Sequence, residues 1–379
     1  MFMKVLIGLS GGVDSAVAAY LLQQQGYEVT ACFMRNWDAL ANNDQLGNPT
    51  INDSQCPQEK DYDDAVKVAN KLSIKLLRID FVKQYWDDVF SYLLKEYRAG
   101  RTPNPDIFCN KYIKFGPFLD YAKENGFPLI AMGHYAKRID QDGKAFMLKP
   151  FDKNKDQTYF LSQISQKQLS SCLFPLGDID KHEVRKIAHQ LGLESVMDKK
   201  DSTGICFIGE RHFRDFLMNY LPAQRGKIVD VETQRIIGYH EGAMFYTIGQ
   251  RKGLGIGGIS GEEAKGWFVV NKDVKKNILY VASGQETDYL YSDSCTVTDL
   301  NFITDVPLEG KHLTAKFRYR QADLGVTIHF IDDKMFELIF DKPYKAVTPG
   351  QAAVLYDGEI CLGGGLIEHI FRNQKQIDI

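Results

Sequence analysis

Short apolar runs alternate with longer amphipathic stretches along the first third of the chain. The apolar runs predict buried strands over Val5–Leu9, Glu28–Met34, Ile74–Ile79 and Pro128–Met132. The amphipathic stretches predict helices that end near Gly26 and that cover Lys60–Leu72, Phe81 to about Ala99, and about Ile107 to Glu124. Strands that alternate with helices are typical of a doubly wound parallel sheet. We expect the polar segment Asp38–Pro57 to be a long loop, closer to a mobile flap than to a buried element.

The pattern changes after this α/β region, which a hairpin over Ala136–Leu148 and a helix over Lys181 to about Gln190 complete. From Asp198 the chain is polar and glycine-bearing, and one helix over Phe213–Tyr220 precedes short β segments. From about Val281 the pattern is all β, with strands predicted over Leu313–Arg320, Val326–Ile331, Met335–Phe340, Ala352–Tyr356 and Glu359–Leu362. We therefore expect an α/β fold: a doubly wound parallel-sheet nucleotide-binding domain (1–200), a small mixed domain (201–280) and a C-terminal antiparallel β-barrel (281–379).

Composition narrows the class of protein. A length of 379 residues with 44% apolar residues is sufficient for several hydrophobic cores. No apolar run has the length of a membrane span, and Met1–Lys4 leads directly into the first strand without a signal segment, so we expect a cytoplasmic protein. A net charge of -3 is not typical of nucleic-acid binders, although a locally basic face would suffice. The seven cysteines are scattered and form no C-x-x-C pair, so neither a disulfide framework nor a four-thiolate zinc site is predicted.

The stretch Ser10–Ser15, with the sequence SGGVDS, is the strongest candidate for a binding site. It lies between the first strand and a helix, and its two glycines allow a tight turn, while Asp14 or Ser15 suits the helix N-cap. Such a turn directs backbone N–H groups toward an anion, and it lies at the strand end where α/β sheets bind nucleotides. It lacks the lysine of the P-loop. A tight turn without a ligand is the alternative.

Two further positions lie at strand ends beside this loop. Met34 ends the second strand, where its backbone could meet an adenine, or where its side chain could equally fill a gap in the core. Gly133 follows the strand at Pro128–Met132 and would let a ribose or phosphate approach closely.

One cysteine has a setting that favours reactivity. Cys109 follows a proline-bounded turn, and if Asp106 begins a helix, the thiol lies one turn later, near a positive helix end and near Lys111. This setting is expected to raise the thiolate fraction. We expect Cys32, Cys172, Cys295 and Cys361 to be small buried side chains instead.

Three segments combine cations with polar or aromatic residues. The run Lys153–Phe160 suits a nucleic-acid backbone or a solvated loop, and Tyr246–Gly255 is predicted to be an exposed binding loop. In the strand Leu313–Arg320, the period of two places Lys316, Arg318 and Arg320 on one face, which indicates either a phosphate-binding stripe or an ordinary solvated face.

Six motifs, in this order over nearly the whole chain, resemble the tRNA-specific 2-thiouridylase family. They are SGGVDS at Ser10, TPNPDIFCNKYIKF at Thr102, AMGHYAKR at Ala131, KDQTYFL at Lys155, STGICFIG at Ser202 and YTIGQRKGLG at Tyr246. The first resembles the loop of ATP pyrophosphatases, which cut ATP between the α and β phosphates. The resemblance implies ATP-dependent sulfur insertion at carbon 2 of the wobble uridine in tRNAs for lysine, glutamate and glutamine.

The resemblance also implies residue roles. ATP, with Mg²⁺ expected beside it, would be held by Gly8, Leu9, Ser10, Gly11, Gly12, Val13, Asp14, Ser15, Met34 and Gly133. The target base would meet Asn104, Pro105 and Asp106, and tRNA would contact His134, Lys155, Asp156, Gln157, Arg318, Tyr319 and Gln351. Cys206 would receive sulfur as a persulfide from a donor relay protein, Cys109 would be the partner thiol, and Asp106 is suited to move a proton.

The chemistry agrees with these roles. A uracil carbonyl oxygen leaves poorly, so ATP must first convert it to an adenylate. Either Cys109 attacks the Cys206 persulfide and releases hydrosulfide, or the persulfide attacks the base directly and Cys109 resolves the linkage. The rivals are an amidating synthetase of the same loop class and a non-catalytic RNA-binding module. The first would not need two separated thiols, and the second would not need the loop.

Overall fold

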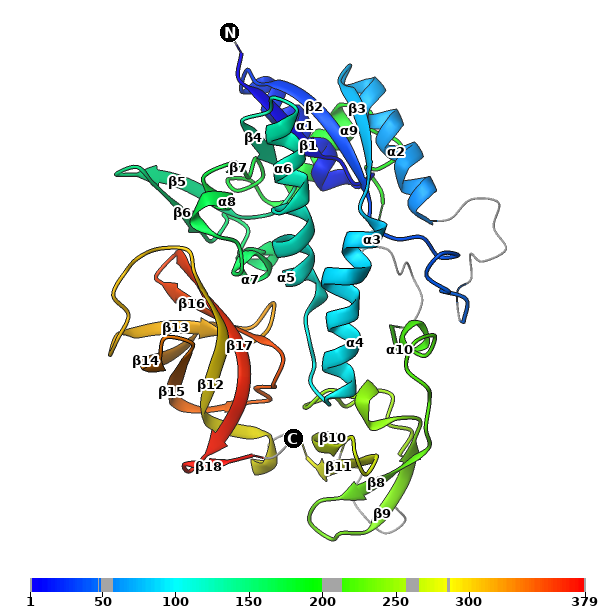
Figure 1. Ribbon diagram of the computed structural model, residues 1–379, viewed down its shortest axis with the longest axis vertical. Coiled ribbons are helices and arrows are strands. Elements are labelled where there is room, and N and C mark those ends of the chain that lie inside the picture. Colours follow the sequence, from blue (N-terminus) through cyan, green and yellow to red (C-terminus); the bar gives the residue numbers. More distant parts are fainter. Residues whose placement is uncertain are drawn as a thin grey trace.

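The computed structural model describes residues 2–46, 48, 57–199, 213–256, 266–284 and 287–377. Its first unit is a parallel sheet at the top of Figure 1. In spatial order the strands are β3 (Lys75–Asp80), β2 (Glu28–Arg35), β1 (Lys4–Gly8), β4 (Leu129–Ala131) and β7 (Cys172–Leu173). Both faces are covered, because Val5 and Ile7 pack into one hydrophobic core while Leu6 packs into another. The predicted doubly wound sheet is confirmed.

Helices cover the two faces unequally. The face of Val5 and Ile7 packs against α1 (Val13–Gln24), α2 (Pro57–Lys71) and α9 (Lys181–Gln190). The opposite face carries a series of shorter helices: α3 (Val82–Tyr85), η1 (Trp86–Phe90), α4 (Ser91–Arg98), α5 (Pro105–Cys109), η2 (Asn110–Lys114) and α6 (Pro117–Glu124). The sequence predicted two long helices here, and the structure divides each of them with a π-helical turn, η1 and η2.

The loop after β2 is partly a packed element in its described residues. Asp44 is buried and accepts a hydrogen bond from the Trp37 indole nitrogen at 3.1 Å. The Tyr220 hydroxyl donates to the Asn42 carbonyl oxygen at 2.8 Å. Residues 38–46 form a loop without helix or strand, as predicted, although Asn42 and Asp44 are buried in it. Its mobility stays a prediction, and residues 47 and 49–56 lie outside the described chain.

The connection from the parallel sheet to the rest of the chain begins with the predicted hairpin. Its strands β5 (Lys137–Gln141) and β6 (Lys144–Leu148) meet at Asp142 and Gly143, as expected. However, β6 also pairs with the barrel strand β17 through Leu148 and Ile360, so the hairpin belongs to the barrel sheet. Short elements follow: η3 (Lys153–Lys155), α7 (Thr158–Leu161) and α8 (Gln166–Leu169).

A small mixed sheet forms the second unit. After α10 (Phe213–Leu217) and around η4 (Ala243–Phe245), its strands in spatial order are β10 (Trp267–Asp273), β11 (Ile278–Ser283), β8 (Gly226–Asp230) and β9 (Ile236–His240). The pair β11–β8 is parallel and the other two pairs are antiparallel. Figure 1 shows α4 running between the parallel sheet and this unit.

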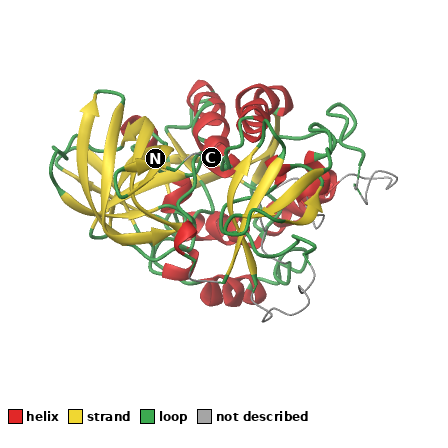
Figure 2. Cartoon of the chain, turned by 90° about the horizontal axis from the view of Figure 1, so that it is seen from below, coloured by secondary structure: helices red, strands yellow, loops and turns green. Residues whose placement is uncertain are grey.

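The C-terminal unit is a closed antiparallel barrel of six strands. After η5 (Asp288–Leu290) come β12 (Tyr291–Phe302), β13 (His312–Lys316), β14 (Leu324–Asp332), β15 (Met335–Lys345), β16 (Ala352–Asp357) and β17 (Ile360–Arg372), followed by β18 (Lys375–Gln376). The barrel closes because β12 pairs with both β15 and β17. Figure 2 shows its strands grouped apart from those of the mixed sheet. The predicted fold class, parallel sheet followed by a mixed unit and a β-barrel, is confirmed.

Hydrogen bonds join the barrel to the segment between α4 and α5. Arg101, in that segment, donates two hydrogen bonds of 2.6 Å to the Glu368 carboxylate on β17. The Thr102 amide donates to the Pro349 carbonyl oxygen at 3.0 Å, and Gln351 donates back to the Thr102 carbonyl oxygen. The turn that leads into α5 is thus held against the barrel. No helix in the described ranges has the length and apolar character that crossing a membrane requires.

Candidate functional site

The loop Ser10–Ser15 is a network of short hydrogen bonds at the carboxyl end of β1. The Ser10 amide donates to the Ser15 Oγ atom at 3.1 Å, and Ser15 Oγ in turn donates to the Gly12 carbonyl oxygen at 3.0 Å. The N-cap of α1 is Gly12, without a side-chain cap, so the prediction of Asp14 or Ser15 at that position is wrong. The first N–H groups of α1 are therefore not satisfied by an N-cap side chain, which is the usual situation at a helix start that binds an anion.

Two glycines of this site are required by close packing. Gly11 has φ of 72°, and a Cβ atom there would collide with the Asp61 carbonyl oxygen of α2. At Gly133 a Cβ atom would lie 2.8 Å from the Ser15 nitrogen. Glycine at position 133 therefore allows the start of α1 to approach the end of β4. The sequence alone did not indicate this structural requirement for a glycine. The contact of Gly133 with a nucleotide stays a prediction.

Met34 and Met132 flank Gly8 at the ends of three neighbouring strands. A Cβ atom at Gly8 would lie 2.9 Å from both the Met34 Cε and the Met132 Sδ atoms. Met34 is partly buried and packs against the hydrophobic core on the face of Leu6. The core-filling interpretation of Met34 is thus supported, and it leaves open whether the backbone of Met34 meets a ligand.

Two lysines that no sequence motif indicated hold this loop. Lys181, the first residue of α9, donates to both Asp14 carboxylate oxygens at 2.7 and 2.8 Å, and the Tyr135 hydroxyl also donates to Asp14. Lys199 donates to the Gly11 carbonyl oxygen at 2.9 Å and pairs with a carboxylate oxygen of Asp61 at 2.6 Å. The only sequence signal for Lys181 is its place at a helix start, 167 positions from Asp14.

The electrostatics of Lys199 agree with its geometry. Burial by itself would lower the pKa of Lys199, but its hydrogen bonds and charge interactions with Asp61 and Asp64 outweigh burial and raise that pKa. Burial also raises the pKa of the Asp61 carboxyl, against the opposing effect of Lys199. The loop is therefore surrounded by fixed charges that a phosphate group would meet on binding.

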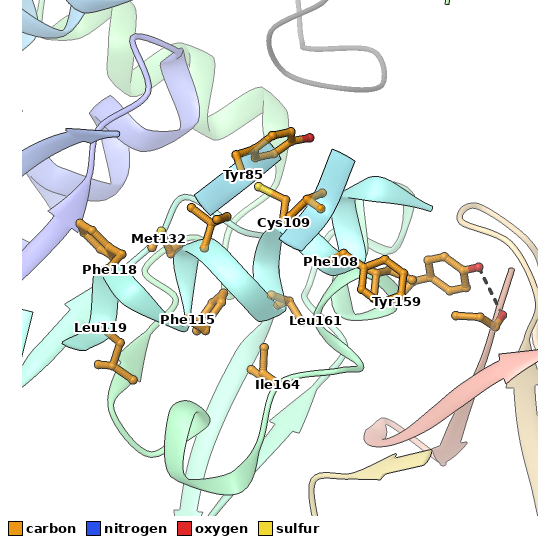
Figure 3. Close-up of a cluster of buried hydrophobic side chains, with 14 of the residues drawn as sticks. Tyr85, Phe108, Cys109, Phe115, Phe118, Leu119, Met132, Tyr159, Leu161 and Ile164 are labelled. Carbon is orange, nitrogen blue, oxygen red and sulfur yellow. Dashed lines mark hydrogen bonds between the residues drawn. The ribbon is translucent and has the colours of Figure 1, made fainter. Parts of the chain in front are cut away.

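Cys109 lies in the hydrophobic core and not at an exposed helix start. It ends α5, whose N-cap is Asn104, with the Asn104 Oδ1 atom accepting from the Asp106 amide at 3.1 Å. Figure 3 shows the thiol among buried side chains, close to Tyr85, and Cys109 is 4% exposed. Burial raises its pKa to about 11, with Lys114 opposing the shift. The expectation of an enhanced thiolate fraction is therefore wrong for this conformation, because desolvation outweighs the nearby positive charge.

Asp106, three residues before this cysteine, has a pKa suited to proton transfer. Burial raises it to about 6, and the charge of Lys114 opposes the shift. At neutral pH the carboxyl is mostly ionised yet remains close enough to neutrality to exchange a proton. The proton-transfer role predicted for Asp106 stays a prediction, and its environment is compatible with it.

The other cysteines divide into two groups. Cys32, Cys172, Cys295 and Cys361 are buried and free, as expected. Cys206, the predicted sulfur carrier, lies outside the described residues, as does Cys56. The pairing of Cys109 with Cys206 therefore stays a prediction.

Several predicted RNA-contacting residues form contacts within the protein. Asp156 is buried and pairs with the Lys316 ammonium at 2.6 Å, and the Gln157 side chain accepts from the Tyr135 amide at 2.9 Å. The Tyr319 ring packs against Phe160, with 4.4 Å between ring centroids. His134 is buried, and burial holds its pKa well below the usual value, so its ring is neutral.

The cationic stripe predicted for the strand at Leu313–Arg320 does not form. The strand β13 ends at Lys316, whose ammonium faces Asp156 and Asp323. Arg318 points inward and donates to the Ile248 and Ala346 carbonyl oxygens, both at 2.8 Å. Arg320 has a positive φ of 64°, which removes it from the strand geometry. Acids of other segments pair with Lys316, carbonyl oxygens accept from Arg318, and Arg320 leaves the strand, so the three cations do not share one face.

The segment Tyr246–Gly255 is also less exposed than expected. Tyr246, Ile248 and Leu254 are buried in the core of the mixed sheet, whereas Arg251 and Lys252 are exposed. The segment is therefore a core-forming connection that presents two cations.

Comparisons with known proteins agree on one family. A family model described as the tRNA methyl transferase HUP domain matches residues 3–210, a PRC-barrel model of the same series matches 214–283, and an aminomethyltransferase beta-barrel model matches 292–367. The domain boundaries at 200 and 280 stay a prediction. A protein of Mycoplasma capricolum named tRNA-specific 2-thiouridylase is 55% identical, over 98% of this chain and all of its own. Relatives with the same name from Acholeplasma laidlawii (54% identical, 98% of each chain) and Geobacillus kaustophilus (53%, with 99% of this chain and 97% of that one covered) match equally completely.

Proposed function

Because the chain belongs to the tRNA-specific 2-thiouridylase family, we propose that it uses ATP and a cysteine persulfide to replace the carbonyl oxygen at carbon 2 of the wobble uridine with sulfur. The substrates are tRNAs for lysine, glutamate and glutamine. The observation that carries the proposal is the uncapped start of α1 with Asp14 and Lys181 beside it. Relatives that are about 55% identical over the full length support sulfur transfer to tRNA in general. We propose the adenylation step and the persulfide step in addition.

The first step activates the base. The N–H groups at the start of α1 bind the phosphates of ATP. Asp14, once released from its ion pair with Lys181, would hold a Mg²⁺ ion, and that ion would neutralise charge on the departing pyrophosphate. The uracil oxygen attacks the α phosphate, so that AMP becomes attached to the base and pyrophosphate leaves. Lys181 and Lys199 lie beside the loop, where they can balance the charge of pyrophosphate as it separates.

The second step transfers sulfur. In the direct route the terminal sulfur of the Cys206 persulfide attacks carbon 2, AMP leaves, and Cys109 then attacks the Cys206 sulfur to release 2-thiouridine. In the other route Cys109 attacks the persulfide first, and the released hydrosulfide attacks carbon 2. Both routes end in a Cys109–Cys206 disulfide, which a reductant must reopen. Sulfur reaches Cys206 from a separate persulfide-carrying protein.

The burial of Cys109 adds a condition to either route. A thiol with a pKa of about 11 is a poor nucleophile at neutral pH, so Cys109 must gain access to solvent or lose its proton when substrate binds. Asp106, within the same helical turn and with a pKa of about 6, is the nearest candidate for that proton.

Product analysis tests the activation step. With ATP and tRNA the protein should release AMP and pyrophosphate, and Asp14→Ala should abolish this release while tRNA binding, measured by filter retention, persists. Gln25→Ala, at the other end of the same helix α1, is the matched control and should keep full activity. Release of ADP and phosphate, or release of AMP without tRNA at the full rate, contradicts the proposal.

A further inference from the structure

A lysine near Cys109 has no partner within the described part of the chain. Lys114 is the last residue of the turn η2, which continues directly from α5, and it is partly buried. Within the described ranges, no hydrogen bond or ion pair uses its ammonium group. A partly buried ammonium without a protein partner loses part of its hydration without compensation, which is unusual outside functional sites.

The π-helical geometry of η2 turns Lys114 back toward the side of Cys109. In a regular α-helix, five steps of about 100° would point these two side chains about 140° apart. In η2 the Phe115 amide donates to the Asn110 carbonyl oxygen at 2.9 Å, and a bond between residues five apart widens the turn. Side chains five positions apart therefore lie more nearly on one face. Such π-turns are frequent at functional sites.

Two side-chain amides fix the two ends of this turn. The Asn110 Nδ2 atom donates to the Phe160 carbonyl oxygen of α7 at 2.9 Å. The Gln168 Nε2 atom of α8 donates to the Phe115 carbonyl oxygen at 2.7 Å. The backbone that carries Lys114 is therefore held in place before any substrate arrives, as the preorganisation of a charged group requires.

The charge of Lys114 acts on three groups of this site. Burial raises the pKa of Asp106 and that of Cys109, and the charge of Lys114 opposes burial in both cases. Burial lowers the pKa of His134, and Lys114 adds to that shift. On the thiol, the effect of Lys114 is larger than the opposing effect of the Asp106 carboxylate. Tyr85, which lies beside the thiol in Figure 3, is a neutral phenol at pH 7.

Lys111, which from the sequence was expected near Cys109, serves another part of the structure. Its ammonium donates to the Gln163 Oε1 atom at 3.0 Å. Burial lowers the pKa of Lys111, and the charge of Asp299 on β12 opposes that shift. Lys114 therefore takes the place of Lys111 as the cation that acts on the thiol.

We propose that Lys114 is a positioning residue that allows Cys109 to pass its proton to Asp106, because the ammonium attracts the negative charge that moves from the carboxylate to the sulfur. The S–H bond of Cys109 breaks, its electron pair stays on sulfur, and the proton forms an O–H bond with Asp106. The net charge of the site does not change. Once Asp106 is neutral, it no longer repels the thiolate, and the attraction of Lys114 remains. The thiolate then attacks sulfur, a step that rests on the proposed function.

Alkylation of Cys109 in the full-length protein tests the effect of this charge. The rate with iodoacetamide at pH 8, followed at the Cys109 peptide by mass spectrometry, reports the thiolate fraction. Lys114→Met should be alkylated about tenfold more slowly than the wild type, which corresponds to about one pKa unit for one nearby charge. Lys114→Arg keeps the charge and should stay within about twofold of the wild type. Lys111→Met, in the same turn, is the matched control and should also stay within about twofold.

The sign of the change separates charge from packing. Loosened packing in a Lys114 variant would expose the thiol and raise its alkylation rate, so a lower rate is assigned to the lost charge. Equal or faster alkylation of Lys114→Met overturns the proposal, and so does equal slowing in Lys114→Arg. If Lys114→Met fails to fold, Lys114→Gln takes its place with the same expected result.

Single-turnover thiolation tests the transfer to Asp106. Asp106 must be ionised to accept a proton, so the wild-type rate should fall below about pH 6. This fall should move up by about one pH unit in Lys114→Met and stay in place in Lys114→Arg, a difference that a purely structural role would not produce. A fall that does not move in Lys114→Met overturns the proton transfer. If the wild-type protein does not thiolate tRNA at all, the proposed function fails, and alkylation alone decides on Lys114.

Discussion

Lys272 of β10 predicts an unusual dependence of stability on pH. Its side chain is 1% exposed, and its ammonium donates to the Tyr246 carbonyl oxygen at 2.7 Å. Burial lowers the pKa from 10.5 to about 7. Between pH 7 and 10.5 the unfolded chain holds a proton that the folded chain has lost, so stability rises with pH in that window and is lowest below pH 7.

The size of the effect follows from the pKa difference. A difference of about 3.5 units corresponds to about 5 kcal/mol at low pH, since each unit is worth about 1.4 kcal/mol. In Lys272→Met this cost disappears, but the Tyr246 carbonyl oxygen loses its donor, which costs about 2 kcal/mol. We expect the variant to be more stable than the wild type by about 3 kcal/mol at pH 6, and this advantage to vanish near pH 9.

Hydrogen exchange of the full-length protein measures the local stability of the mixed sheet around Lys272. A local measurement is needed because a chain of three units does not unfold in a single step. Amides of β10 and β11 should exchange about 100-fold more slowly in Lys272→Met than in the wild type at pH 6, and at nearly equal rates at pH 9. The exposed Lys275→Met is the matched control and should change neither rate. Faster exchange in Lys272→Met at pH 6, or a difference that does not change with pH, would refute the reasoning.

Three further predictions concern other parts of the chain. Because its pKa is about 11, Cys109 in the protein without tRNA should react with iodoacetamide about tenfold faster per pH unit up to pH 11, and fast labelling at pH 7 would contradict its burial. Lys316→Met leaves the buried Asp156 carboxylate unpaired and should destabilise the protein in denaturant by about 3 kcal/mol, without changing the salt dependence of tRNA binding. Gly11→Ala should reduce stability by at least about 1 kcal/mol and abolish ATP cleavage, whereas Gly26→Ala, at a positive φ with open space around it, should keep full activity; equal behaviour of the two would disprove the packing argument.

The elements that sequence patterns predicted well are those whose signal is local. The strand β1, the glycine turn and the helix α1 follow one another within 24 residues, and the helix α9 has the predicted bounds Lys181–Gln190. The hairpin at Asp142 was predicted as well, but its membership in the barrel sheet depends on pairing between Leu148 and Ile360. The alternation of apolar and polar residues within the hairpin does not indicate that pairing.

Several of the errors share a physical cause, which is contact with segments that are distant in the sequence. The period of two in β13 correctly placed Lys316 on the opposite face from its apolar neighbours. However, the acid that pairs with Lys316 is Asp156, which lies 160 positions away in the sequence, so a local pattern could not predict it. Likewise, the helix start before Cys109 predicted a reactive thiol, but the side chains that bury it belong to other helices and to the sheet. Lys181 was missed because its partner Asp14 lies in another element.

The central claim is tested most directly by nucleoside mass spectrometry of tRNA treated with the purified protein, ATP and a persulfide donor. 2-Thiouridine should form at the wobble position with the wild type and with Cys361→Ser, and should be absent with Cys109→Ser or Cys206→Ser. Absence of 2-thiouridine with the wild-type protein, or its formation at the wild-type rate by either of the two inactive variants, would contradict the account.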